Sequence, residues 1–221
     1  GEPSRQPTAP EATPARLICF AVPFSTFHGE DEALRARVDD LDAAIAQLRS
    51  AELTDPETVA ARDRVLAFCR RNQDALHRTC RRGHLTGSAL VVDAAGRRTL
   101  LLHHAKLDRW LQPGGHADGD GNLAAVALRE ATEETGIVGL KVVTPAIDID
   151  VHTIPERGDE PAHLHLDVRF LVLAPQDAVI EHNDESFSAR WAGPDDPAIA
   201  CSAELSRVVG RALSVAREVS G

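Results

Sequence analysis

The apolar residues of this chain recur with two different periods, and each period predicts one kind of secondary structure. Between residues 30 and 50 they recur at steps of three and four residues, which is the period of an amphipathic helix. A second helix is expected after the capping sequence at residues 54–57, so that the two helices form a hairpin ending near Gly83. The apolar stripe of such a hairpin has to be buried, and we expect it to pack on the chain's own domain.

After Gly83 the pattern changes to short apolar runs bounded by turn residues, as is typical of β-strands. A glycine-rich loop and a helix interrupt these runs, and a last helix is expected near residues 202–219. Strands with helices between them favour an α/β or an α+β domain. The expected strands are 88–93, 99–103, near 140–153 and near 163–173.

These changes of pattern divide the chain into three segments. Residues 1–14, with prolines among small and polar residues, are expected to be a disordered tail. Residues 15–84 are expected to be a mainly helical extension, and residues 85–221 the main α/β domain. Three arginines near the end of the extension are expected in its last helical turn, where cations favour the helix dipole, with phosphate binding as the alternative. They are Arg78, Arg81 and Arg82.

The charge and the cysteines restrict the class of partner and the cellular compartment. The formal net charge of −10 argues against a nonspecific binder of nucleic acid or of an anionic membrane. An acidic protein that binds a polyphosphate needs local positive charge, which a metal ion usually supplies. No apolar stretch approaches the length of a membrane span, and the first residues lack the layout of a signal peptide. The four cysteines are scattered without a paired metal spacing, so we expect reduced thiols in a cytoplasmic protein.

Polar residues alternate with apolar ones in the two strands expected near 140–153 and 163–173, so each polar set lies on one side of its strand. An antiparallel hairpin is expected, with its turn centred between Gly158 and Asp159. The facing pairs are then His152 with His165, Asp150 with Asp167, and Asp148 with Arg169. Because facing carboxylates are unfavourable, we expect a surface that faces a substrate or a metal ion, with a plain solvent face as the alternative. The expected substrate-binding residues are His152, His163, His165, Asp167 and Arg169, with His116 from the glycine-rich loop.

The glycine-rich loop, residues 114–122, leads into a helix with a dense group of glutamates. Glu130, Glu133 and Glu134 stand at positions i, i+3 and i+4 and therefore share one face. Because carboxylates this close repel each other, a hard divalent cation bound through oxygen atoms would explain them, with a solvated acidic face as the alternative. Gly136 is expected to end this helix in the left-handed conformation.

The same stretch resembles the Nudix box. The box reads glycine, five residues, glutamate, seven residues, and then arginine, glutamate, an aliphatic residue, any residue, two glutamates, any residue, glycine and an aliphatic residue. Here Gly115 is followed after five residues by Gly121 and, after seven more, by residues 129–137. The first glutamate of the box is thus replaced by Gly121, and its first aliphatic position holds Ala131.

The resemblance covers residues 85–221, including the flanking segments 110–113 and 190–191, and it implies a fold and a chemistry. The fold is a Nudix-like α/β/α sandwich with a mixed β-sheet, preceded here by the helical extension. The chemistry is Mg²⁺-dependent hydrolysis of a diphosphate linkage in a nucleoside diphosphate derivative by metal-activated water, with Mn²⁺ as a substitute for Mg²⁺.

The resemblance also implies roles for single residues of the box. The metal would be held by glutamates and by one backbone carbonyl of the glycine-rich loop. The implied metal ligands are Glu130, Glu133 and Glu134, with the carbonyl of Gly115 or Gly114. Arg129 would hold a glutamate in place, so that the implied catalytic residues within the box are Arg129, Glu133 and Glu134.

The base and the number of metal ions are less closely defined by the resemblance. The family often uses a glutamate on a late loop as a further ligand or base, which makes Glu185 the catalytic candidate there and Glu181 the second choice. Gly121 puts the number of metal ions in doubt, because a carboxylate is missing at that position. Asp118 or Asp120 could replace it.

Two other functions are weighed against hydrolysis. A Nudix-fold nucleotide-binding or regulatory module without turnover is the alternative that Gly121 favours. Isomerase chemistry on a prenyl diphosphate, which also occurs on this fold, is disfavoured because no cysteine lies near the glycine-rich loop or the expected hairpin of strands. The expected partner is a small-molecule nucleotide, with no nucleic acid and no membrane, and the N-terminal helices could form the interface of a homodimer.

Overall fold

The computed structural model describes residues 23–105, 107–181, 183 and 186–220. The predicted tail at residues 1–14 lies outside the described residues. The strands are β1 (Ser25–His28), β2 (Gly83–Val92), β3 (Thr99–His104), β4 (Arg109–Leu111), β5 (Gly114–His116), β6 (Lys141–Ile154), β7 (His163–Leu173) and β8 (Ser186–Ala192). The helices are α1 (Leu41–Ser50), α2 (Pro56–Cys69), α3 (Leu123–Thr135), α4 (Pro197–Ala200) and α5 (Ala203–Ser220), with a 3-10 turn at Glu32–Leu34.

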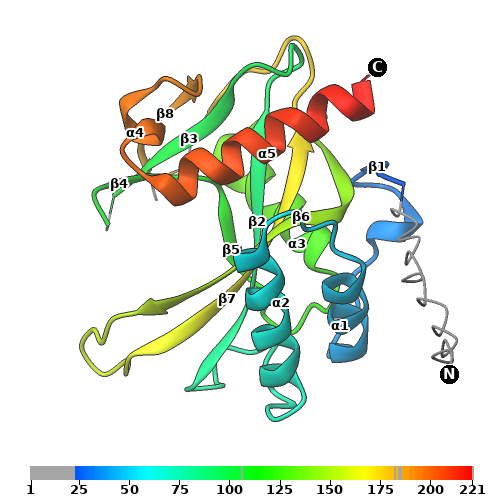
Figure 1. The fold of residues 1–221 in the computed structure, drawn as a ribbon, viewed down its shortest axis with the longest axis vertical. Helices are drawn as coiled ribbons and strands as arrows, with labels where there is room; N and C mark the ends of the chain where they lie inside the picture. Colours follow the sequence, from blue (N-terminus) through cyan, green and yellow to red (C-terminus); the bar gives the residue numbers. More distant parts are fainter. Residues whose placement is uncertain (1–22, 106, 182, 184–185, 221) are drawn as a thin grey trace, which may run out of the picture.

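All these strands join one mixed sheet in the order β1-β6-β7-β2-β3-β4, with β5 paired to β2 and β8 paired to β3. β2 and β7 run parallel, whereas β6 and β7 form an antiparallel hairpin that projects beyond the rest of the sheet (Figure 1). The predicted mixed sheet is therefore confirmed. The predicted register of the hairpin is also confirmed, with pairs His152–His165, Asp150–Asp167 and Asp148–Arg169.

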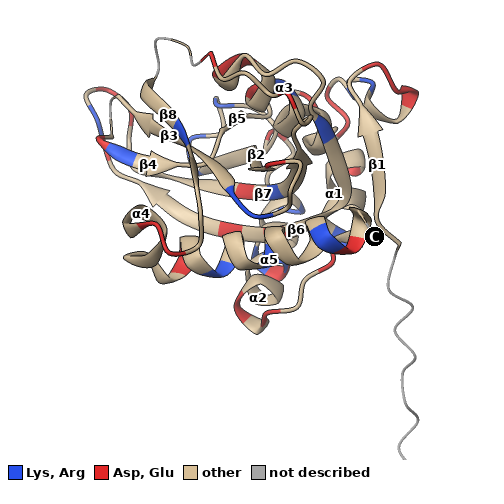
Figure 2. Ribbon diagram, turned by 90° about the horizontal axis from the view of Figure 1, so that it is seen from above, with Lys and Arg blue, Asp and Glu red and all other residues tan. Residues whose placement is uncertain are grey.

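Helices cover both faces of the sheet, because apolar side chains point to both sides of its central strands. One hydrophobic core joins β7 residues such as Val168 to α1, α2 and α3. A second core joins residues such as Leu171 to the amphipathic α5. In Figure 2 the sheet lies between α3 and α5. This is the α/β/α sandwich expected from the sequence.

The first predicted helix is shorter than its apolar period indicated. Only Leu41–Ser50 is α-helical, and residues 35–40 run along the glycine-rich loop instead. The backbone N–H of Asp39 donates to the carbonyl of Gly119 (2.7 Å), and the N–H of Gly121 donates to the carbonyl of Arg37 (2.9 Å). The helix prediction for residues 30–40 was wrong because these long-range backbone bonds replace helical ones.

The second predicted helix ends earlier than expected, at Cys69, and turns fill the chain up to β2. The arginines at 78, 81 and 82 therefore do not stabilise a helix end, and that prediction was wrong. Arg78 instead donates two hydrogen bonds to Asp118, at 2.7 and 2.5 Å. The apolar residues of both helices pack on the sheet, as expected, with Leu48 and Val65 fully buried.

None of the described helices combines the length and the apolar character needed to cross a membrane.

Candidate active site

The helix that carries the glutamates, α3, begins and ends at capping residues. The side chain of Asn122 accepts a hydrogen bond from the backbone N–H of Ala125 (3.4 Å). Gly136 ends the helix with φ of +65°, so the predicted left-handed end is confirmed. The buried side of α3 packs against β2 and β5, which brings the glutamates next to the glycine-rich loop.

Glu130 and Glu134 lie directly against the backbone of the glycine-rich loop. The backbone N–H of Gly114 donates to Glu134 Oε2 at 3.0 Å. A Cβ atom at position 115 would overlap the carboxylate of Glu130, so only glycine fits there without a shift. Arg129 donates to Glu130 Oε1 at 2.9 Å, which is the contact expected for a residue that holds a glutamate in place.

The electrostatics of Glu130 match a cation site. Burial raises the pKa of the Glu130 carboxyl, and the charges of Glu133 and Asp118 add to this rise against the lowering effect of Arg129. Hard divalent cations prefer oxygen ligands, such as carboxylates and backbone carbonyls. The glutamates of α3 and the carbonyls of the glycine-rich loop therefore fit Mg²⁺. The glutamates do not bring three side-chain ligand atoms within 4.8 Å of one another. Among the described residues, a group of histidines does.

The two aspartates considered as replacements for the missing glutamate hold other partners. Asp118 accepts the two hydrogen bonds of Arg78, which lower its pKa. Asp120 Oδ1 accepts from the backbone N–H groups of Arg37 (2.9 Å) and Asn122 (2.8 Å). Asp120 thus joins the N-terminal segment to the start of α3, and a metal-binding role for either aspartate stays a prediction.

The loop before β8 passes the end of α3. The backbone N–H of Glu181 donates to the carbonyl of Thr135 at 2.8 Å, and the side chain of Glu181 is exposed. Glu185, the first candidate for the base, lies outside the described residues. Glu181 thus lies beside the C-terminal end of α3, and the role of either glutamate stays a prediction.

The predicted polar surface of β6 and β7 divides into two parts. In the first part, Arg169 is almost completely buried and forms ion pairs with four carboxylates. The partners and distances are Asp167 (2.8 Å), Asp148 (3.1 Å), Asp150 (3.3 Å) and Glu204 of α5 (2.7 Å). Asp167 also accepts from the hydroxyls of Thr86 and Ser88 on β2, both at 2.8 Å.

These contacts place Asp167 and Arg169 in an internal network between the sheet and α5. Burial by itself lowers the pKa of Arg169, but the surrounding carboxylates outweigh it and raise that pKa. A fully satisfied network of this kind favours a structural role. Contact of Asp167 and Arg169 with a substrate stays a prediction.

The second part of the polar surface is a cluster of five histidines from four neighbouring strands. His84 of β2 stands opposite His165 in the parallel register, and His152 of β6 stands opposite His165 on the other side. The ring centre of His84 lies 4.9 to 5.0 Å from those of three other histidines. The cluster consists of His84, His116, His152, His163 and His165.

The structure thus brings four predicted substrate-binding histidines together and adds one that the sequence reasoning missed. Burial lowers the pKa of His84 to about 4 and that of His165 to about 3, with a further contribution from the neighbouring histidines. His152 differs, because its hydrogen bond to Asp150 (2.7 Å) raises its pKa. The alternation of His84, Thr86 and Ser88 could have indicated a polar face on β2.

The two segments that flank the box, on β4 and β8, lie on either side of β3. The ring of Trp110 on β4 stacks on that of His103, with ring centres 4.9 Å apart, and the guanidinium of Arg190 on β8 lies 4.4 Å from the Trp110 ring centre. Asp196 fixes Arg190 through an ion pair at 2.6 Å. Nothing in the local sequence indicated this stack, which depends on the pairing of β3 with both β4 and β8.

Comparison with known proteins was made for the sequence and for the fold. Residues 84–211, more than half of the chain, match the family model described as the NUDIX domain. No curated protein sequence matches the chain.

Several solved structures are similar to this one. A NUDIX family hydrolase from Clostridium perfringens is 19% identical, with 60% of this chain and 97% of that chain covered and a TM-score of 0.42. The Ap4A hydrolase of C. elegans is 21% identical, with 59% and 96% covered and a TM-score of 0.42. The dihydroneopterin triphosphate pyrophosphohydrolase of E. coli is 13% identical, with 57% and 91% covered and a TM-score of 0.41.

Proposed function

Because the chain belongs to the NUDIX family, we propose that it hydrolyses a diphosphate linkage in a nucleoside diphosphate derivative with Mg²⁺ as its cofactor. As a Nudix-type hydrolase, it needs a place where phosphate oxygens and a divalent cation can meet. The observation that carries the proposal is the contact of Glu130 and Glu134 with the backbone at Gly115 and Gly114. A side chain at position 115 would displace the Glu130 carboxylate from this position.

The residues of this chain would divide the work as follows. Glu130, Glu133 and Glu134 would hold Mg²⁺, with a carbonyl of the glycine-rich loop, and Mn²⁺ could replace it. The bound ion would supply Lewis-acid activation of a phosphoryl oxygen and of the attacking water. Arg129 keeps the Glu130 carboxylate oriented through its 2.9 Å hydrogen bond.

The remaining roles fall to a late glutamate and to the histidines. Glu181, whose side chain is exposed, or Glu185 would take up a proton from the attacking water. His116, His152, His163 and His165, whose rings cluster, would contact the substrate. A cytoplasmic location and a homodimer through the N-terminal helices stay predictions. Among the described residues, Cys69, Cys80 and Cys201 are free thiols.

The test replaces Glu134 by glutamine in the full chain and follows Mg²⁺-dependent hydrolysis over a panel of nucleoside diphosphate derivatives. Metal assistance is worth several kcal/mol, so Glu134→Gln should lower turnover by at least about 100-fold. Glu218→Gln is the matched control, because Glu218 is exposed on α5, away from the glycine-rich loop. Undiminished turnover in Glu134→Gln would remove the assignment of the metal site.

A binding or regulatory module without turnover is the second candidate, and the observation in its favour is Gly121 in place of a glutamate. Calorimetry with Mg²⁺ and the same nucleotides separates the two candidates. Saturable nucleotide binding without any hydrolysis in the unmodified chain would support the module.

A further inference from the structure

Three histidines place one nitrogen each around a common point, outside the Nudix box. Ligand atoms of His84, His163 and His165 all lie within 4.8 Å of one another. The sheet dictates this arrangement, because the parallel register sets His84 opposite His165, and His163 lies two residues earlier on the same face of β7. The strands are parts of the central sheet, so the three side chains start from a rigid base.

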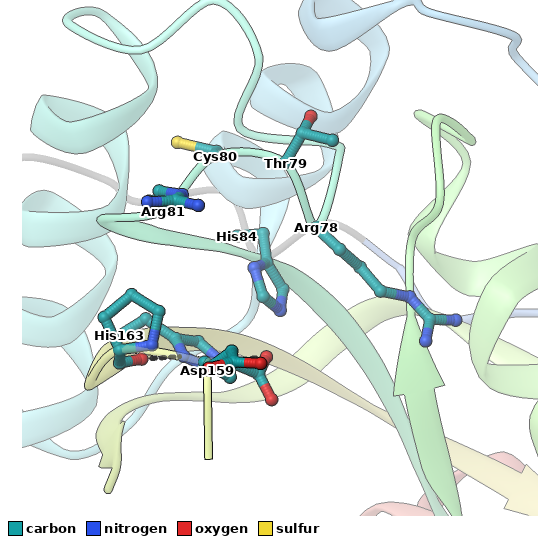
Figure 3. A pocket seen from close by; sticks show the side chains of 9 residues that line it. Arg78, Thr79, Cys80, Arg81, His84, Asp159 and His163 are labelled. Atoms are coloured by element: carbon teal, nitrogen blue, oxygen red, sulfur yellow. Dashed lines mark hydrogen bonds and ion pairs between the residues drawn. The ribbon is translucent and has the colours of Figure 1, made fainter. Parts of the chain in front are cut away.

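His84 is buried, with 2% of the residue exposed. Among the described residues, neither Nδ1 nor Nε2 of its ring has a hydrogen-bond partner. A buried imidazole can satisfy only one nitrogen as a donor and the other as an acceptor, and leaving both unmade is unfavourable. Figure 3 shows the ring pointing toward His163, whereas the thiol of Cys80 points away from it. A ligand bound between the histidines would provide the missing partner.

His163 is already held in the tautomer that binds metal. Its Nδ1 lies 2.9 Å from the carbonyl oxygen of Pro161. A carbonyl oxygen can only accept, so Nδ1 carries the proton and Nε2 keeps its lone pair. A histidine that donates its other N–H to a backbone carbonyl is the usual arrangement at metal sites.

The type of ligand follows from the donor atoms. His84, His163 and His165 each offer one ring nitrogen, and these ligand atoms lie within 4.8 Å of one another. Neutral imidazole nitrogens suit zinc and similar transition ions, whereas Mg²⁺ prefers oxygen.

We propose that His84, His163 and His165 bind one divalent transition-metal ion of the zinc class, at a site separate from the glutamates of α3. Three histidines leave a fourth position of a tetrahedral ion open. His84 and His163 also border a cavity of about 490 Å³, whose lining includes Arg78 and Arg81 as well as Asp159 and Glu160. A water molecule or an oxygen of a small molecule would complete the coordination from there.

The test measures metal binding directly, so it does not depend on hydrolysis. The full chain is freed of metal with a chelator, and Zn²⁺ affinity is then measured by competition with a chromophoric chelator, with Co²⁺ absorption as a report on nitrogen ligands. One Zn²⁺ per chain is expected. His84→Gln, His163→Gln and His165→Gln should each weaken binding by at least about 100-fold.

Two controls separate this site from others. His103→Gln removes a histidine that stacks on Trp110 outside the cluster and should bind Zn²⁺ as the unmodified chain does. Glu134→Gln should also keep its Zn²⁺ affinity, whatever its effect on hydrolysis. Zn²⁺ should raise the Tm of the unmodified chain and of both controls, but not that of the three cluster variants.

The outcomes decide the proposal in either direction. His84 is buried, so if His84→Gln fails to fold, the less central His163→Gln and His165→Gln variants decide. No stoichiometric Zn²⁺ binding by the unmodified chain would overturn the site. Unchanged affinity in His163→Gln and His165→Gln, or loss of affinity in Glu134→Gln, would overturn it as well.

Discussion

Gly121 lies against the backbone carbonyl of Asp40, and a Cβ atom at position 121 would overlap that oxygen. The N–H of Gly121 also donates to the carbonyl of Arg37 at 2.9 Å. The segment around residues 37–40 therefore occupies the space that a side chain at position 121 would need. The absence of the first glutamate of the box follows from the way the N-terminal extension packs on the glycine-rich loop.

Restoring that glutamate should harm the protein and leave its metal site unimproved. Gly121→Glu has to push residues 37–40 away from the loop, and we expect a loss of about 1–3 kcal/mol in the free energy of unfolding, as is typical of overpacking. Urea denaturation measures this loss. Gly210→Glu is the control, because Gly210 is exposed on α5 with open space around it. Equal stability of the two variants, or a lower Mg²⁺ requirement in Gly121→Glu, would contradict the explanation.

The parts of the fold that the sequence predicted correctly are those with local signals. Period-two alternation and the position of one turn fixed the register of β6 and β7, including the pair His152–His165. A glycine after a run of helix formers marked the end of α3 at Gly136. Both signals depend on neighbouring residues only, so no knowledge of the tertiary structure was needed.

The parts that the sequence did not predict depend on contacts between distant segments. His84 joins the histidine cluster only because β2 and β7 pair in parallel, and nothing in the local sequence specifies that pairing. The segment at residues 35–40 has a helical period, but backbone bonds to Gly119 and Gly121 hold it in a non-helical conformation with a turn at residues 37–40. The ion pair of Arg169 with Glu204 depends on the packing of α5 against the sheet, which the local sequence did not indicate. Such tertiary contacts override local preference.

A methyl group at position 115 should disturb the metal site without unfolding the protein. The Cβ of Gly115→Ala would overlap the Glu130 carboxylate, which sits at the end of a flexible side chain and can rotate away. That rotation would break the hydrogen bond to Arg129. We expect the Mg²⁺ concentration for half-maximal hydrolysis to rise about 10- to 100-fold, as for other losses of ligand orientation. Metal titration of activity measures it, with Gly193→Ala, which meets no neighbouring atom, as the control. An unchanged Mg²⁺ requirement would contradict the role of Glu130.

Removing Arg169 should destabilise the fold strongly and in a pH-dependent way. Arg169→Met leaves the buried carboxylate of Asp167 without its arginine and that of Asp148 with Arg207 alone, and the expected loss of unfolding free energy is about 3–5 kcal/mol at neutral pH. Burial raises the pKa of the Asp148 carboxyl, and the loss of Arg169 removes a charge that lowers this pKa. A carboxyl with a raised folded-state pKa destabilises the fold less as the pH falls. The loss of unfolding free energy should therefore become smaller as the pH falls toward about 4, the pKa of an unperturbed carboxyl group.

Urea denaturation at neutral and at acidic pH checks this expectation. Arg207→Met is the matched control, because Arg207 also pairs with Asp148 but its side chain is 28% exposed, so its loss should be smaller. If Arg169→Met is as stable as the unmodified chain and instead raises KM for the nucleotide, Arg169 contacts the substrate, as the sequence had indicated.

The thiol of Cys69 should be inert in the folded protein and should make stability fall at alkaline pH. Burial raises the pKa of Cys69 from 9.0 to about 11. A thiol whose pKa is higher in the folded state than in the unfolded state contributes to stability at pH values below the unfolded-state pKa. As the pH rises above that value, the free energy of unfolding falls by up to about 1.4 kcal/mol per pH unit. Denaturation between pH 8 and 11 should show this fall in stability. Cys69→Ala should lose the part of the fall that Cys69 causes, whereas Cys201→Ala should keep it.

In a Cys19→Ser background at pH 8, a disulfide-exchange reagent should label the exposed Cys201 rapidly and Cys69 only after unfolding. Equal labelling rates of the two thiols in the native protein would contradict the buried position of Cys69.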